Sequence, residues 1–257
     1  MNDRTTNLDA PRELAWLGDH CRRVGLVVPP SNPVAEPEMD ALLGDDILIY
    51  SDRLPRLVGL PLEERNLRYV PAYGDALDEL AGLDLECALI AMTGPNYRLG
   101  LEGDRKLCEE LSARLGAPVA TTSLATFEAL SALGADRIHL VSPYPDWLTD
   151  AAVEYWSGAG IEVAGLERLL GEGEEFHAYE TPTAEVVDQL KSLAPKEGAA
   201  VVLSGTGLGS VAATWQVAGA LEAPILSSDL CGAWWILNQC EGSEGSDLYR
   251  SIAPTPQ

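Results

Sequence analysis

Residues 23–33 read RVGLVVPPSNP, and residues 137–147 read RIHLVSPYPDW. Each segment is an apolar run that ends in a polar loop containing prolines. Two more pairs follow in the same order, and the members of every pair lie about 105–115 residues apart. A spacing kept over three pairs predicts an internal duplication. The other pairs are ALIAMTGPN (88–96) with VVLSGTGLG (201–209), and GAPVATTSLATFEAL (116–130) with EAPILSSDLCGAWWIL (222–237).

Helical patterns separate the apolar runs, for example EGDRKLCEELSARLG (102–116) and TAEVVDQLKSLA (183–194). The runs do not alternate between polar and apolar residues, which is typical of parallel strands covered on both faces. We therefore predict an α/β fold with two pseudo-symmetric, Rossmann-like half-domains and a site in the cleft between them. Residues 1–22 are predicted to be an N-terminal arm, 23–118 with 224–257 the first half-domain, and 119–223 the second.

The composition limits the classes of partner. The chain has 257 residues and a net charge of −23, which argues against nucleic acid and against anionic membrane surfaces. It has no apolar run long enough to span a membrane and no signal-peptide pattern, so we expect a cytoplasmic protein with reduced cysteines. The cysteines lack CxxC spacing, and no metal site is predicted. The sequence leaves open whether the chain forms a homo-oligomer.

The polar loops after the strands are the candidate site. Ligands of open parallel sheets bind beyond the carboxyl ends of the strands, where loops lead into helix N-termini. These loops are rich in Ser, Thr, Gly and Asn, which suits a small carboxylate. Any one loop taken alone reads better as a helix cap, and it is the six loops together that favour a site. The loops are Pro30–Pro33, Met92–Pro95, Thr121–Ser123, Ser142–Asp146, Ser204–Gly207 and Ser227–Asp229.

At these loops the sequence resembles the aspartate/glutamate racemase superfamily, in particular its maleate isomerase and arylmalonate decarboxylase branch. The segments that carry the resemblance include GLVVPPSNPVAEPEM (25–39), AMTGPNYRLG (91–100), LVSPYPDWL (140–148) and LSGTGLGS (203–210). The resemblance implies two half-domains around a central site and chemistry without metal, pyridoxal phosphate or nicotinamide. It also implies carboxylate-binding roles for Ser31, Asn32, Thr93, Gly94, Tyr144, Gly205, Thr206 and Gly207.

The chain departs from this branch in its cysteines. The resemblance implies a cysteine after the strand in each half, or in the second half alone, but Met92 and Gly205 stand at these positions. Neither residue can act as a nucleophile or carry a proton. The candidates for a proton donor are Tyr144, Thr206, a bound water and Cys231. Cys231 is either a displaced catalytic thiol in the first turn of a helix or a packing residue beneath the cleft.

The functional hypothesis is an enzyme that needs no cofactor and acts on a small mono- or dicarboxylic acid. Decarboxylation through a stabilised enediolate ranks ahead of maleate isomerisation or racemisation, because the usual thiols are missing. A non-catalytic relative that keeps the carboxylate pocket as a sensor is the alternative.

Overall fold

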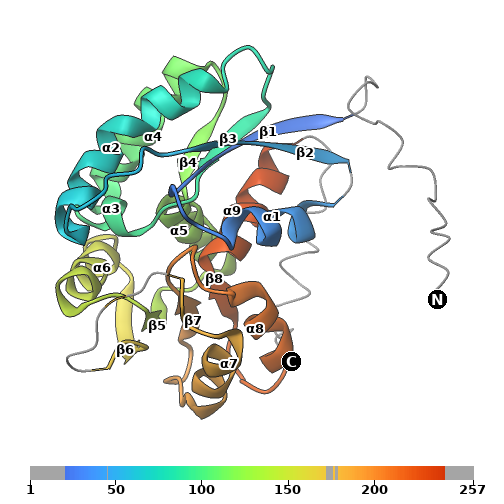
Figure 1. Cartoon of the computed structure of the whole chain (residues 1–257). Coiled ribbons are helices and arrows are strands. Elements are labelled where there is room, and N and C mark those ends of the chain that lie inside the picture. Colours follow the sequence, from blue (N-terminus) through green and yellow to red (C-terminus); the bar gives the residue numbers. More distant parts are fainter. Residues whose placement is uncertain (1–20, 45, 172–175, 177–178, 241–257) are drawn as a thin grey trace, which may run out of the picture.

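The computed structural model describes residues 21–44, 46–171, 176 and 179–240. It contains two four-stranded parallel sheets (Figure 1). The first has the order β2-β1-β3-β4 and the second the order β6-β5-β7-β8, so each half repeats the same strand order. This confirms the α/β class and the duplication. The strands are β1 (Arg22–Val28), β2 (Ile47–Arg53), β3 (Cys87–Ile90), β4 (Val119–Thr121), β5 (Arg137–Ser142), β6 (Glu162–Arg168), β7 (Ala200–Leu203) and β8 (Ile225–Ser227).

Helices follow the strands in both halves. The last helix of each half begins at a hydroxyl cap: Thr121 Oγ1 accepts the N–H of Leu124 at 3.1 Å, and Ser227 Oγ accepts that of Leu230 at 3.2 Å. These equivalent caps explain the hydroxyl residues of the repeated sequence. The helices are α1 (Ala35–Leu43), α2 (Leu62–Glu79), α3 (Gly94–Tyr97), α4 (Gly100–Leu115), α5 (Thr122–Leu133), α6 (Asp146–Gly158), α7 (Thr183–Ser192), α8 (Ser210–Val217) and α9 (Ser228–Gln239).

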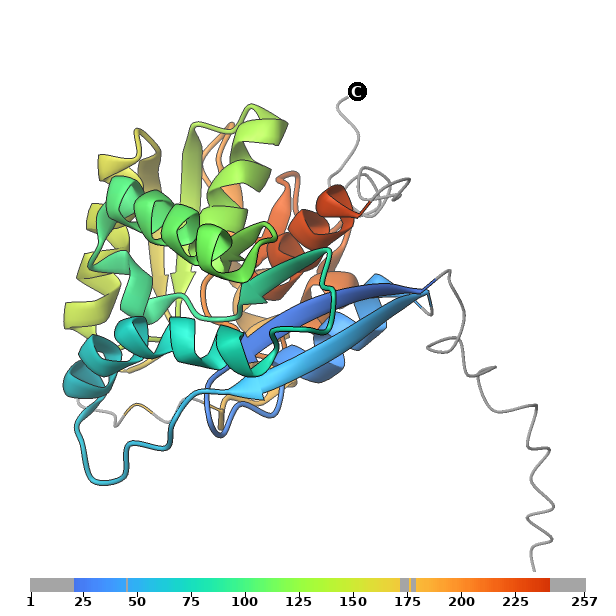
Figure 2. The ribbon, with the colours of Figure 1, turned by 90° about the horizontal axis from the view of Figure 1, so that it is seen from above.

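The inner faces of the two sheets share one apolar core. Leu26 and Leu89 of the first sheet belong to the same buried cluster as Leu140 and Val202 of the second. Separate clusters lie on the outer faces, under α2 and α4 in the first half and under α7 and α8 in the second. Figure 2 shows the long neighbouring strands β1 and β2 of the first sheet from another side. The shared core holds the two sheets in a fixed relation, which the site between them requires.

The strands correct the predicted half-domain boundaries. The prediction assigned residues 119–223 to the second half, but β4 pairs with β3 in the first sheet. It assigned 224–257 to the first half, but β8 pairs with β7 in the second sheet. The C-terminal assignment fails because the chain passes from the second half back to the first after β8. Helix α9 follows β8 but packs against α1 and β3 of the first half. A strand and the helix after it thus belong to different lobes.

Residues 1–20 of the predicted arm and the terminal residues 241–257 lie outside the described part of the chain. Strand β1 already begins at Arg22. Within the described residues, none of the helices combines the length and the apolar character that a membrane crossing needs.

Candidate active site

The loop after β1 is held by a buried asparagine. Asn32 is 2% exposed, and its Oδ1 accepts the N–H groups of Val34 at 2.8 Å and Ala35 at 3.1 Å, which turns the chain into α1. Its Nδ2 donates to the carbonyl oxygen of Thr206 at 3.1 Å and to the Thr206 hydroxyl at 3.3 Å. Asn32 is therefore both the turn residue of this loop and a bridge to the other half of the molecule.

The loops after β3 and β7 meet across the same interface. Thr206 Oγ1 donates to the carbonyl oxygen of Ala91 at 2.9 Å, and the hydroxyls of Thr93 and Tyr144 lie 2.5 Å apart. Each of these contacts joins a residue of the first half to one of the second. The equivalent loops of the duplication therefore face each other, as the repeat predicts.

Several backbone N–H groups in these two loops have no acceptor within the described part of the chain. Among the described residues, none accepts a hydrogen bond from the N–H of Thr93, Gly94, Thr206 or Gly207. Unsatisfied N–H groups beside a pocket are a ready site for a carboxylate or an oxyanion.

Gly205 has a conformation that favours glycine. Its φ is +102°, and a Cβ built there would lie 3.1 Å from the Tyr144 hydroxyl oxygen and 3.3 Å from Pro143 Cγ. Its N–H donates to the buried Ser228 hydroxyl at 2.9 Å, which fixes the loop from below. A side chain at this position would therefore be strained and would press on Tyr144.

Tyr144 lies between Pro143 and Pro145 and is half-buried. Burial raises the pKa of its hydroxyl to about 12, so Tyr144 is protonated at neutral pH and can donate a hydrogen bond or a proton. The ring of Tyr97 packs edge-on against it, with the ring centroids 6.5 Å apart.

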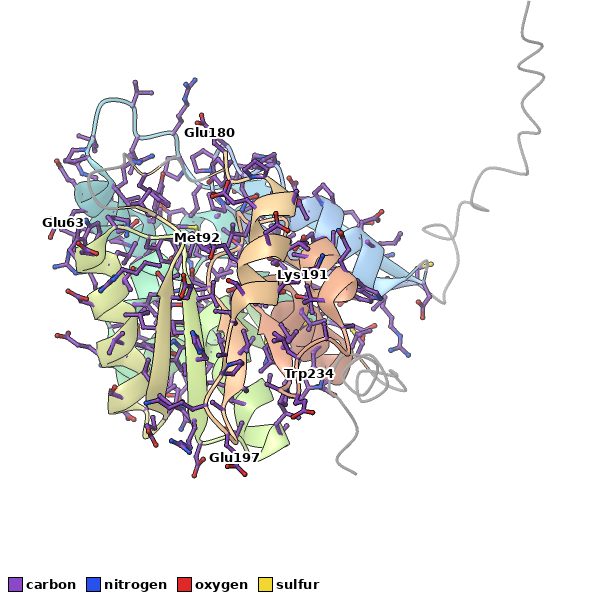
Figure 3. All side chains as sticks on the ribbon, turned by 90° about the horizontal axis from the view of Figure 1, so that it is seen from below. Glu63, Met92, Glu180, Lys191, Glu197 and Trp234 are labelled. Carbon is purple, nitrogen blue, oxygen red and sulfur yellow. The ribbon has the colours of Figure 1, made fainter. Side chains whose placement is uncertain are left out.

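A pocket lies between the two halves, and the structure brings together at it all the residues that were predicted to bind substrate. Met92, which also lines the pocket, lies near the middle of the molecule in Figure 3. Glu197, which precedes β7, lies well away from it in that view. Four of the six predicted loops line the pocket, while the Thr121–Ser123 and Ser227–Asp229 loops are buried beneath it. The predicted residues that line it are Ser31, Asn32, Thr93, Gly94, Tyr144, Gly205, Thr206 and Gly207.

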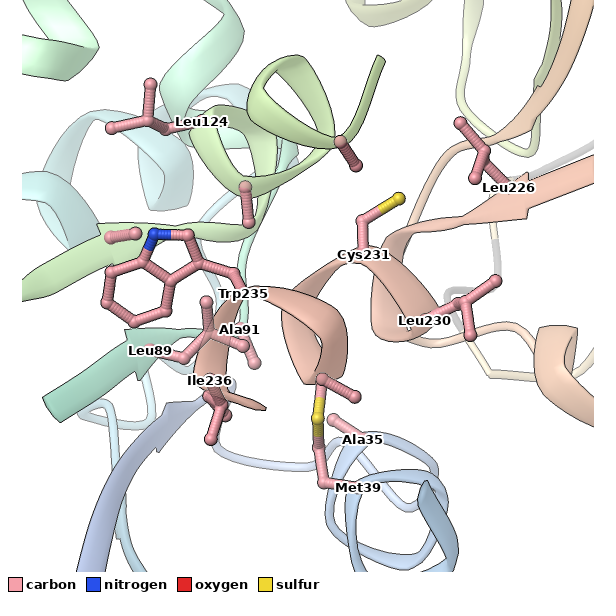
Figure 4. Packing of buried hydrophobic residues seen from close by; sticks show 14 of the residues in the cluster. Ala35, Met39, Leu89, Ala91, Leu124, Leu226, Leu230, Cys231, Trp235 and Ile236 are labelled. Atoms are coloured by element: carbon pink, nitrogen blue, oxygen red, sulfur yellow. The ribbon is translucent and has the colours of Figure 1, made fainter. Parts of the chain in front are cut away.

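Cys231 does not reach the pocket, so the prediction of a catalytic thiol at this position is wrong. Its side chain is 0% exposed and belongs to the central core. Figure 4 shows it on the side of α9 facing away from Ala35 and Met39. Burial raises the pKa of the thiol to about 12, so a thiolate is disfavoured. The alternative reading, packing beneath the cleft, agrees with this position.

Two neighbouring carboxyl groups lie outside the pocket lining, the half-buried Glu38 and the fully buried Asp229. Glu38 accepts the N–H of Val211 at 2.9 Å and the hydroxyl of Ser210 at 3.1 Å, and so caps α8 from the other half. Burial and the neighbouring Glu38 raise the pKa of Asp229 well above its ordinary value. Burial thus favours the neutral form of the Asp229 carboxyl, which does not line the pocket.

Sequence reasoning missed the wall that α2 contributes. Arg65, Asn66 and Tyr69 line the pocket, as does Tyr179 from the second half. Their only sequence signal was a polar stretch in an ordinary amphipathic helix. Arg53, at the end of β2, does not line the pocket. It pairs with Glu36 and donates to carbonyl groups of the loop after β1.

The fold and the site define a two-lobed α/β protein of the aspartate/glutamate racemase superfamily, in the branch of maleate isomerases and arylmalonate decarboxylases. The family model "Arylmalonate decarboxylase" matches residues 24–248. The chain belongs to the arylmalonate decarboxylase family.

Relatives carry two different activities. The chain is 28% identical over 235 residues to a maleate isomerase of Geobacillus stearothermophilus, covering 84% of this chain and 90% of that protein. A solved maleate cis-trans isomerase variant of Nocardia farcinica, described with a covalently bound succinylcysteine intermediate, is 25% identical with a TM-score of 0.79; the match covers 90% of this chain and 99% of that one. An unliganded arylmalonate decarboxylase has the same fold at 21% identity and a TM-score of 0.70, over 86% and 94% of the two chains.

Proposed function

We propose that the protein is an enzyme that removes CO₂ from a small malonate-type acid, through an enediolate held between the two halves. The observation that supports this most is the set of N–H groups at Thr93–Gly94 and Thr206–Gly207, for which the described residues provide no acceptor. Donors placed before the reaction, where negative charge develops, commonly provide the largest part of catalysis. The family resemblance suggests that no cofactor is needed.

The reaction balances with the groups at the pocket. The bond between the α-carbon and one carboxylate breaks, CO₂ leaves, and the electron pair stays on the α-carbon. The remaining carboxylate becomes an enediolate, which the loop N–H groups and the hydroxyl of Thr93 stabilise. Tyr144 then gives its proton to the α-carbon, and water restores that proton. Its pKa of about 12 keeps the proton available at neutral pH.

Isomerisation ranks second because of the sulfur chemistry that it involves. The Nocardia farcinica isomerase is described with a succinylcysteine, in which a thiol is joined to the substrate carbon. Among the described residues that line this pocket none is a cysteine, and the expected positions carry Met92 and Gly205. A carboxylate sensor without activity is the third candidate, and it would use the same donors.

A screen of small carboxylic acids by thermal shift, followed by proton NMR in D₂O, separates the three candidates. For a decarboxylase we expect a substituted malonate to be converted into the monoacid with one deuterium at the α-carbon. Conversion of maleate into fumarate without loss of CO₂ would instead establish an isomerase. Stabilisation by acids without turnover of any of them would establish a binding protein and overturn the proposal.

Cys231→Ser should leave turnover unchanged within about twofold, because a residue packed away from the pocket gives no transition-state interaction to lose. Cys108→Ser is the matched control, since Cys108 is also a buried thiol away from the pocket. Steady-state kinetics of the two folded variants provide the measurement. Loss of activity in Cys231→Ser alone would assign the thiol a catalytic role.

A further inference from the structure

The wall formed by α2 presents polar groups to the pocket that the proposed reaction does not use. Arg65, Asn66 and Tyr69 all line the pocket from the first turns of this helix. The donors assigned to the enediolate come from the loops after β3 and β7 instead, and the proton donor Tyr144 comes from the loop after β5. The α2 wall is therefore available for a different part of the substrate.

Asn66 is a buried amide with an unused donor. Its residue is 4% exposed, and its Nδ2 has no hydrogen-bond partner among the described residues. The amide lies beside Gly94, because a Cβ built on Gly94 would be 3.5 Å from Nδ2. An unsatisfied buried donor is costly, so this amide favours a ligand that brings an acceptor.

Arg65 brings the positive charge. It is the charged residue among the described residues that line the pocket, and its Nε has no hydrogen-bond partner in the described part of the chain. Burial raises the pKa of the Tyr69 hydroxyl, and the neighbouring Arg65 opposes that rise. Tyr179 lies within electrostatic range of both Arg65 and Tyr144, so the cation and the proposed proton donor border the same space.

Other arginines nearby are already paired with carboxylates. Arg68 on the same helix pairs with Glu64 at 2.6 Å, and Arg98 pairs with Glu63 at 3.0 Å. In a chain with a net charge of −23, a local cation at the pocket is the means of attracting an anion.

We infer that Arg65 and Asn66 form a second subsite, which binds an anionic group on the side chain of the substrate and selects such substrates over those with an apolar side chain. The inference rests on the proposed function, because the subsite has a use only if the loops hold the first carboxylate. A carboxylate there would accept from the Asn66 amide and from the Arg65 guanidinium, two charge-assisted contacts.

Calorimetric titration with succinate, butyrate and phenylacetate tests the subsite without requiring turnover. We expect the wild-type protein to bind succinate at least about tenfold more tightly than butyrate, and Arg65→Met to lose that preference while it keeps its affinity for butyrate. Asn66→Leu should weaken succinate in the same direction. Arg68→Met is the matched control, because it removes an exposed arginine from the same helix outside the pocket, and it should retain the preference.

The outcomes separate the two ideas. Equal affinity of the wild-type protein for succinate and butyrate, or a stronger affinity for phenylacetate, would overturn the subsite and leave the proposed function standing. An unchanged preference in Arg65→Met, or an equal loss in Arg68→Met, would also overturn the subsite. Binding of none of the acids would remove the proposed function and the subsite with it.

Discussion

Tyr144→Phe is expected to lower kcat/KM for decarboxylation by about 10²- to 10⁴-fold, the range that a positioned general acid contributes. Tyr144 lies in the pocket, and its hydroxyl is 2.5 Å from that of Thr93 in the other half. Its removal takes away the proposed proton source and leaves the N–H groups of the loops in place. We therefore expect most of the loss in kcat, with KM changed little.

The matched control is Tyr97→Phe. Tyr97 is a buried tyrosine of the same aromatic cluster, and its hydroxyl lies 2.6 Å from Ser204 Oγ in the other half. It does not line the pocket. Both variants delete one cross-lobe hydroxyl contact, so both should lose about 1 kcal/mol of stability. If Tyr97→Phe lost as much activity as Tyr144→Phe, the effect would come from packing and the role of Tyr144 would be wrong.

The pH profile adds a separate test of Tyr144. Because burial raises its pKa to about 12, the hydroxyl stays protonated where an ordinary tyrosine ionises. Ionisation of Tyr144 should therefore cause no loss of wild-type activity near pH 10. The pH profiles of the wild-type protein and of Tyr144→Phe should have the same shape in that range. Such a fall would mean that the hydroxyl is more exposed to water in solution than its burial indicates.

The strand and loop part of the fold could be predicted from the sequence, for a physical reason. Strands buried on both faces leave continuous apolar runs such as Val24–Val28, and the polar loop after each run marks the carboxyl end of the sheet. Duplication then places two sets of loops face to face. The duplication therefore predicts that these loops meet, and Asn32, Thr93, Tyr144 and Thr206 of four of the loops do line one pocket.

The parts that depend on how the elements pack could not be predicted. The pairing of β4 with β3 and of β8 with β7 depends on contacts between segments that are far apart in the sequence. The packing of α9 on the first half depends on the shared core, which is also not local in sequence. Arg65 and Asn66 lie on a helix whose pattern says which face is buried, but not that this face borders a pocket. Cys231 had a chemically attractive position in a first helical turn, yet the core surrounds it.

Asp104→Asn is expected to remove much of the pH dependence of folding stability between pH 4 and 8. Asp104 of α4 is 0% exposed; it accepts the Thr121 hydroxyl at 2.8 and 2.9 Å and the Tyr155 hydroxyl at 2.9 Å. Burial outweighs these donors and raises the pKa of the carboxyl to about 7, from 3.8. The folded protein therefore binds a proton that the unfolded chain has already released.

The sign of the effect follows from that difference. Between about pH 4 and pH 7 the native state holds more protons than the unfolded state at this site, so the free energy of unfolding falls as pH rises, and it levels off above pH 7. At about 1.4 kcal/mol per pH unit, the fall due to this group is on the order of 4 kcal/mol. The asparagine variant is neutral throughout, keeps an oxygen for Thr121 and can donate its amide to Tyr155. Relative to wild type it should therefore gain stability steadily from pH 4 to pH 7.

Urea unfolding of both proteins at several pH values measures this difference directly, since contributions that the two proteins share cancel. Glu109→Gln is the control, because it makes the same carboxylate-to-amide change at an exposed position of the same helix. A constant difference between Asp104→Asn and wild type would mean that Asp104 ionises alike in the folded and unfolded chains. In that case water or another donor must reach the carboxyl, and the contact that joins α4 to α6 across the two halves would be a solvated one.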